Sequence, residues 1–290
     1  MIYAYGLTQQ GHYHIASGLV CQDAHQILRR SERMAVAAVA DGLGSETRSD
    51  IAAKLAAELS TAFCAEHIAE DSPEEEILKR IREAFSLSQR EIEKTAAERG
   101  EDFDQYDTTL SLAVLIGDTL YYGHSGDSGI LALTTDGLYE KVTEQQLDEE
   151  GRVYPLYFGE EKWVFGKYPR PVASVLLATD GMYELFFPVY IRNEAVPVYT
   201  ALARYFMDPQ ALHAREVSEA ETGERIGRFV ASIPASQVKD DKTLVVLTDP
   251  EREIRYQPPT YYAEPDWPAL KRKYEEAWQR AAYPQLFGED

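Results

Sequence analysis

Cysteine is scarce in this chain of 290 residues, which has only Cys21 and Cys64. Two cysteines are too few for a disulfide framework in a chain of this length, and they cannot complete a structural zinc site. We therefore expect two reduced thiols. The fold must rest on its core instead, and a hydrophobic content of 44% with 11% aromatic residues is typical of a packed globular protein.

Long apolar runs are also missing. No segment approaches the roughly 18 uninterrupted apolar residues of a membrane span, and the N-terminus has no basic stretch followed by an apolar run. We therefore expect a cytoplasmic protein.

Basic residues are few compared with acidic ones. The chain has 29 Lys and Arg against 49 Asp and Glu, which gives a net charge of −20. A field of that sign repels nucleic acid and anionic membrane surfaces, so we expect neither as a partner.

Periodic apolar residues predict two long helices. Over residues 48–69, side chains four residues apart share one helical face, which we expect to be core: Ile51, Leu55, Leu59 and Phe63. The next helix is expected to begin at a capping box with Ser72 as N-cap, Pro73 as the first helical residue and Glu75 as the reciprocal partner. It should end near Gly100.

Elsewhere the pattern favours short strands. We expect them over residues 34–40, 110–116, 119–124, 129–134, 172–178 and 243–247, with those between 110 and 134 forming an antiparallel meander. Residues 1–20 are expected to be extended and rich in turns. Residues 151–171 have several aromatic residues but no clear period, which predicts a long surface loop or hairpin of the kind that flanks an active site.

Composition changes after residue 250. We expect one domain over residues 1–250, and a Pro- and Tyr-rich connector with a C-terminal amphipathic helix over residues 251–290. The apolar residues of this helix are Leu270, Tyr274, Trp278 and Ala281. We expect it to dock on its own domain, and binding of a partner is the alternative.

Carboxylates stand at the ends of three predicted strands. Asp41 and Asp180 each follow a strand and precede a glycine, and Asp240 comes shortly before the last strand. Hard divalent ions take oxygen ligands, and a site for two such ions needs several carboxylates. A single Asp-Gly pair is more often a plain turn, and we expect no more than that of Asp136-Gly137.

Six short elements together are far more specific than one such pair. They are Cys21-Gln22-Asp23-Ala24, Val39-Ala40-Asp41-Gly42-Leu43-Gly44-Ser45, Asp107-Thr108-Thr109-Leu110, Gly126-Asp127-Ser128, Ala178-Thr179-Asp180-Gly181-Met182 and Asp240-Asp241-Lys242-Thr243. In this order and spacing the sequence resembles the metal-dependent protein phosphatases of the protein phosphatase 2C type, in a bacterial-like variant. The resemblance covers about residues 1–248 and makes residues 1–250 the catalytic domain.

The resemblance implies an α+β fold, a four-layer αββα sandwich of two antiparallel sheets flanked by helices. It also implies Mn²⁺ or Mg²⁺ as cofactor, with two ions and in many members a third. Asp41 would bridge both ions, the carbonyl of Gly42 would bind one, and Asp180 and Asp240 would hold the other. Asp23 would lie beside the metals, and Asp127 would hold the third ion with Asp180, close to Glu184.

The sequence departs from the family pattern at several positions. Residues 15–20 contain no arginine to bind substrate phosphate, so that residue is unknown, and His12, His14 and Arg29 are candidates that could equally be structural. Three further positions differ from residues found in other members: Gln22 replaces the first acid of the usual pair, Leu43 stands where some members have a histidine that bacterial-type members often lack, and Gly129 replaces an arginine that often follows Gly-Asp-Ser.

The activity that the resemblance implies is hydrolysis of phosphoserine and phosphothreonine in proteins. Water held between the ions would attack phosphorus, with no catalytic side chain. We expect a phosphorylated protein substrate, a kinase or a kinase target, in cytoplasmic signalling. Two alternatives stay open, a hydrolase of small phosphate esters and a pseudophosphatase that binds phosphoproteins without turnover. The pseudophosphatase should have lost metal carboxylates, yet Asp41, Asp180 and Asp240 are all present.

Overall fold

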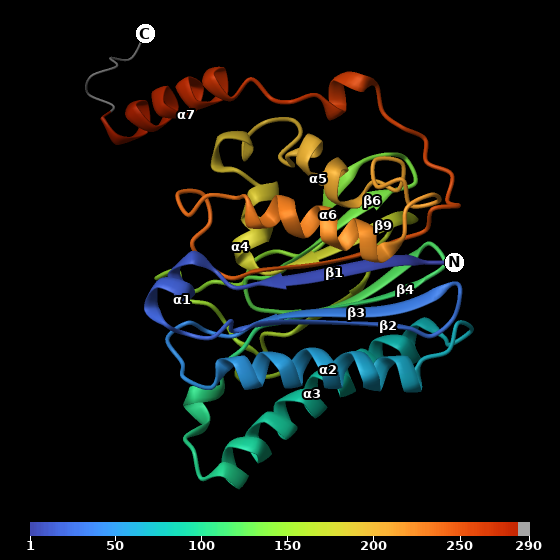
Figure 1. The fold of residues 1–290 in the computed structure, drawn as a ribbon, viewed down its shortest axis with the longest axis vertical. Helices are drawn as coiled ribbons and strands as arrows, with labels where there is room; N and C mark the ends of the chain where they lie inside the picture. The colour runs from blue at the N-terminus through green and yellow to red at the C-terminus, as the bar shows by residue number, and fades with distance from the viewer. Residues whose placement is uncertain (284–290) are drawn as a thin grey trace.

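The computed structural model describes residues 1–283, so the end of the predicted 251–290 segment lies outside the described residues. Two five-stranded antiparallel sheets lie face to face with helices on both outer sides (Figure 1). The first sheet has the strand order β1 (Tyr3–Gln9), β10 (Lys242–Thr248), β9 (Val172–Ala178), β6 (Gly129–Thr134), β7 (Tyr139–Lys141). The second has the order β2 (Asp23–Arg29), β3 (Met34–Asp41), β4 (Leu110–Ile116), β5 (Thr119–Ser125), β8 (Val164–Lys167). This confirms the four-layer αββα sandwich.

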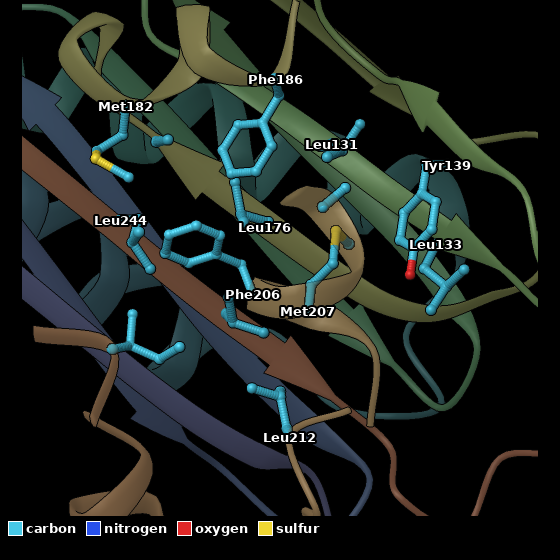
Figure 2. Close-up of a cluster of buried hydrophobic side chains, with 14 of the residues drawn as sticks. Leu131, Leu133, Tyr139, Leu176, Met182, Phe186, Phe206, Met207, Leu212 and Leu244 are labelled. Carbon is cyan, nitrogen blue, oxygen red and sulfur yellow. The ribbon is translucent and has the colours of Figure 1, made fainter. Parts of the chain in front are cut away.

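Two groups of helices form the outer layers. The second sheet is covered by α2 (Ser49–His67) and α3 (Glu74–Arg99), and the first by α4 (Asp180–Tyr183), α5 (Thr200–Met207) and α6 (Glu219–Ala231) (Figure 1). On the first sheet, the rings of Phe186 and Phe206 meet at 5.6 Å over Leu176 and Leu244 (Figure 2). No helix in the described part of the chain is long and apolar enough to cross a membrane.

The central strands are apolar on both faces because each lies between two layers. In β3, Val36 and Ala38 pack toward α2 and α3, whereas Ala37 and Val39 face the other sheet. Successive side chains of a strand point to opposite faces, so a strand buried on both sides reads as a continuous apolar run. Such runs made these strands visible in the sequence.

The predicted core face of α2 packs against the core but does not form its centre. The fully buried residues of this helix are small ones, including Ala52, Ala53, Ala56, Ala57 and Ser60. The larger Ile51, Leu55 and Phe63 are only partly buried at the edge of the core. Small side chains allow the helix to approach the sheet closely, which a search for large apolar residues does not detect.

Three other predictions need correction. Residues 110–134 are not one meander, because β4 and β5 form a hairpin in the second sheet while β6 pairs with β7 and β9 in the first. Helix α3 begins without the capping box, and Ser72 Oγ instead accepts a hydrogen bond from Ala69 N at 3.0 Å. The opening segment includes a short helix, α1 (His12–Ser17).

The segment after residue 250 has two parts. The connector packs on the first sheet through Tyr262, whose hydroxyl donates to the Gly137 carbonyl at 2.8 Å. The predicted C-terminal helix is present as α7 (Trp267–Ala282), has no buried residue and extends beyond the sandwich (Figure 1). It contacts the short helix η4 (Val189–Ile191), where the Tyr190 and Tyr274 rings lie 5.4 Å apart.

Candidate metal centre

Five aspartates from separate segments gather at one end of the sandwich. Asp23 begins β2 and lies opposite Asp41 at the end of β3. Asp127 lies between β5 and β6, Asp180 follows β9, and Asp240 comes two residues before β10. Antiparallel pairing brings the start of one strand to the end of its neighbour, and the two facing sheets place both sets of ends together.

The electrostatics of the five aspartates show how closely they are grouped. Burial raises the pKa of Asp41 well above its usual range, and the strongest charges acting on Asp41 are the carboxylates of Asp23, Asp180, Asp127 and Asp240. Burial also raises the pKa of Asp127 to about 7 and that of Asp180 to about 6, in each case with help from neighbouring carboxylates. A group of carboxylates that repel each other in a partly buried site fits divalent cations.

Hydroxyl groups hold Asp41 in place from the adjacent strand. The Asp41 carbonyl accepts hydrogen bonds from Thr109 N at 2.8 Å and Thr108 Oγ1 at 3.0 Å, and Asp41 N donates to Thr109 Oγ1 at 3.0 Å. Thr109 Oγ1 also lies 2.9 Å from Ser128 Oγ, next to Asp127. No role was predicted from the sequence for these threonines or for Ser128. In the sequence, only their position within the quoted motif elements indicated that they lie near the site.

Asp23 is held by the opposite sheet. Thr179 Oγ1 donates to Asp23 Oδ2 at 2.8 Å, and Thr243 N donates to Thr179 Oγ1 at 3.2 Å. One hydroxyl thus links the start of β2 to the end of β9 and the start of β10.

Gly42 lies where no larger residue fits. A Cβ atom at this position would lie 2.6 Å from the Ser49 carbonyl oxygen and 2.7 Å from that of Gln22. The glycine lets the chain leave β3 beside Asp41, and the predicted role of its carbonyl as a ligand stays a prediction.

A buried aspartate next to Asp240 was not singled out from the sequence. Asp241 accepts hydrogen bonds from Gly11 N and Gln22 N, both at 2.6 Å. Its Oδ2 also lies 2.8 Å from His14 Nδ1, and His14 Nε2 lies 4.0 Å from Asp240 Oδ1.

His14, Asp240 and Asp241 therefore form a compact group, with one possible ligand atom from each within 4.8 Å of the others. The carboxylate of Asp241 already binds two backbone N–H groups, so we assign it to holding the site together and not to binding an ion.

The candidates for phosphate binding lie in different places. Arg29 is at the far end of β2 from Asp23, roughly 20 Å away for six strand residues. It forms an ion pair with Glu219 there. His14 is only 3% exposed and packs against Asp241, whereas His12 is exposed and its Nε2 lies 3.3 Å from the Ile233 carbonyl.

The three motif residues that depart from the family pattern, Gln22, Gly129 and Leu43, each make local contacts. Gln22 is buried, and its Nε2 donates to Ser49 Oγ at 2.6 Å. At Gly129, a Cβ atom would lie 2.1 Å from the ring of Tyr183, which fills this space. Leu43 N donates to the Asp107 carbonyl at 3.0 Å. Gln22 and Leu43 lie in the segments next to Asp23 and Asp41, and Gly129 begins β6 close to Asp127.

A groove of about 1190 Å³ opens beside the aspartates, and Asp180, Glu184 and Asp240 line it. Its other walls come from residues 138–145, 187–198 and 235–239, with Tyr13 and Tyr261. Residues 151–171 do not line it, but they lie beside the motif residues that hold Asp41, since Leu156 N donates to the Thr108 carbonyl at 2.7 Å. They form β8, which pairs with β5, and bury Trp163 against Phe85 of α3.

Known proteins share both the sequence pattern and the fold. The sequence model of the protein phosphatase 2C family matches residues 10–220. No curated protein sequence matches the chain. Among solved structures, the Mycobacterium tuberculosis serine/threonine phosphatase PstP/Ppp is 20% identical with a TM-score of 0.57, covering 85% of this chain and 98% of that one.

Two further solved structures are similar. The Staphylococcus aureus serine/threonine phosphatase Stp1 is 13% identical with a TM-score of 0.58, covering 86% of this chain and 95% of that one. The S. agalactiae serine/threonine phosphatase is 15% identical with a TM-score of 0.56, covering 86% and 99%. At these identities the likeness shows the fold, whereas the family model spans most of the chain. The chain therefore belongs to the protein phosphatase 2C family, a family of protein-serine/threonine phosphatases.

Proposed function

We propose that this chain hydrolyses phosphoserine and phosphothreonine in proteins at a metal centre built from its clustered aspartates. The observation that carries the proposal is the convergence of four carboxylates around that of Asp41, whose strongest charged neighbours are all negative. We assign two ions to Asp41, the Gly42 carbonyl, Asp180 and Asp240, with Asp23 beside them.

Each residue has a defined task in this proposal. Asp41 lies among the other carboxylates and would bridge the two ions, while Thr108 and Thr109 hold its backbone. Asp127 lies near Asp180 and would share a third ion with it. Bound divalent cations supply charge neutralisation and the acidification of a water molecule for attack on phosphorus. Because all ligands are oxygen atoms, Mg²⁺ and Mn²⁺ are the expected metals.

The proposed partner is a phosphorylated cytoplasmic protein, a kinase or a kinase target. We also propose that residues 1–250 contain the catalytic machinery and that residues 251–290 are an addition to it. All five aspartates lie in the first of these segments.

Metal-dependent turnover tests the proposal. Hydrolysis of p-nitrophenyl phosphate and of a phosphothreonine peptide is measured with Mn²⁺ or Mg²⁺ and again with EDTA. We expect turnover of both that stops when the metal is removed. Turnover of p-nitrophenyl phosphate alone would indicate a hydrolase of small phosphate esters. Metal binding without any turnover would indicate a pseudophosphatase, and activity that survives EDTA would refute the metal centre.

A further inference from the structure

The groove beside the aspartates is larger than phosphate chemistry requires. Its volume of about 1190 Å³ exceeds the roughly 300 to 1,000 Å³ typical of small-molecule sites. It is continuous with the metal centre, because Asp180 and Asp240 form part of its lining. A substrate whose phosphate reaches the aspartates therefore has room to place neighbouring residues in the groove.

One wall of the groove is apolar and exposed. Val189 is 44% exposed and Val196 is 36% exposed, and both line the groove with Phe187 and Pro197. Apolar side chains grouped in a concavity are a common feature of binding sites. The backbone of this wall is held from outside, where Tyr190 packs against Tyr274 of α7.

Three cations line the same groove, and Lys141 pairs there with Glu144. Arg192 and Lys239 are exposed, and within residues 1–283 neither has an ion-pair partner. Lys239 directly precedes Asp240, so positive charge lies close to the proposed metal centre. Such cations attract acidic groups and would lower the affinity for basic ones.

We propose that this groove binds the substrate polypeptide next to the phosphorylated residue and selects segments with an aliphatic and an acidic side chain there. The aliphatic side chain packs on Val189 and Val196, and the acidic side chain pairs with Arg192 or Lys239. The inference rests on the proposed function, because it assigns the substrate class of the same site.

Matched phosphothreonine peptides test the selection. The residues that flank the phosphothreonine are Val and Asp in the first peptide, Ser and Asp in the second, and Val and Lys in the third. For each peptide, kcat/KM is measured relative to the value for p-nitrophenyl phosphate. For the wild-type protein we expect the peptide with Val and Asp to be preferred about fivefold to tenfold over either of the others. Equal values for all three peptides would overturn the inference.

Substitutions in the groove provide the second arm. Arg192→Glu should reverse the preference between Asp and Lys, and Val189→Asp should abolish the preference for Val over Ser. Matched controls are Arg90→Glu on the exposed face of α3 and Val164→Asp on β8, where Val164 is also 44% exposed. Both controls should keep the wild-type preferences.

The two proposals fail in different ways. If the wild-type protein hydrolyses p-nitrophenyl phosphate with metal but Arg192→Glu and Lys239→Glu both keep the wild-type preference for Asp, the groove assignment is wrong and the phosphatase chemistry stands. If no substrate is turned over with either metal, the proposed function itself is wrong.

Discussion

His14 Nδ1 and Asp241 Oδ2 lie 2.8 Å apart, and both side chains are almost fully buried. The same carboxylate accepts hydrogen bonds from Gly11 N and Gln22 N. It therefore links the start of β10 to the N-terminal segment that carries Asp23. The two adjacent aspartates would thus have different tasks in our proposal, since Asp240 is 56% exposed and lines the groove.

Asp241→Ala should destabilise the protein. The substitution leaves two buried N–H groups without acceptors, which we expect to lower the free energy of unfolding by about 2 to 4 kcal/mol. Thermal unfolding in EDTA should show a Tm lower by roughly 5 to 10 °C. Asp240→Ala is the matched control and should leave the Tm of the metal-free protein close to that of the wild type. An unchanged Tm for Asp241→Ala would contradict the structural role of this residue.

Asp41→Ala and Asp180→Ala should abolish turnover without unfolding the protein. We expect kcat/KM for p-nitrophenyl phosphate to fall by about a thousandfold or more, equivalent to roughly 4 kcal/mol of transition-state stabilisation. Each change removes one member of a repelling group, so the metal-free Tm should not fall. As a control, Asp136→Asn in the turn after β6 should leave turnover unchanged. Retained activity in Asp180→Ala would refute the ligand assignment.

The stability of the metal-free protein should depend on pH through the same carboxylates. Burial and neighbouring charges raise the pKa of Asp127 to about 7 and of Asp180 to about 6. A carboxyl group whose pKa is higher in the folded than in the unfolded state stabilises the fold below pH ~4, and this contribution is lost as pH rises through ~6 to ~7.

Asp127→Asn should therefore stabilise the metal-free protein at pH 8 but not at pH 4. We expect a gain on the order of 1 to 3 kcal/mol at pH 8, measured by urea unfolding in EDTA. The comparison with wild type at each pH cancels the titration of other groups. A gain of the same size at both pH values would show that repulsion at Asp127 is not the cause.

Thr109→Val should weaken the metal centre through Asp41. The change removes the hydroxyl that accepts from Asp41 N and contacts Ser128. Groups that orient metal ligands typically contribute about tenfold to a hundredfold in metal affinity or activity, and we expect a loss of this size in the Mn²⁺ titration of activity. Thr248→Val removes a buried hydroxyl that donates to the Ala173 carbonyl at the opposite end of β10. Its metal titration should match wild type.

Two truncations test where the catalytic unit ends. Removal of residues 264–290 deletes α7, which has no buried residue, and should change the free energy of unfolding by less than about 1 kcal/mol. Removal of residues 251–290 also deletes Tyr262 and its hydrogen bond to Gly137, and should cost about 3 kcal/mol or more. Equal stability of the two truncated proteins would place the boundary at residue 250.

The sequence determined much of the fold because its signals are local. Continuous apolar runs marked β3, β4 and β9, which are buried on both faces. The order and spacing of the Asp-containing motifs indicated the family and the aspartates of the site. Strand propensity, however, does not indicate which sheet a strand joins. The change of sheet between β5 and β6 was therefore not predicted.

Only the tertiary structure decided how the site is held together. Asp241 meets Gly11 and Gln22 across more than 200 residues, and Thr179 meets Asp23 across a separation of 156 residues. The groove was also missed, because its wall at residues 187–198 has no periodic pattern. Side-chain type and spacing specify helices and strands, whereas hydrogen bonds between distant segments and the shape of a concavity exist only once the layers have packed.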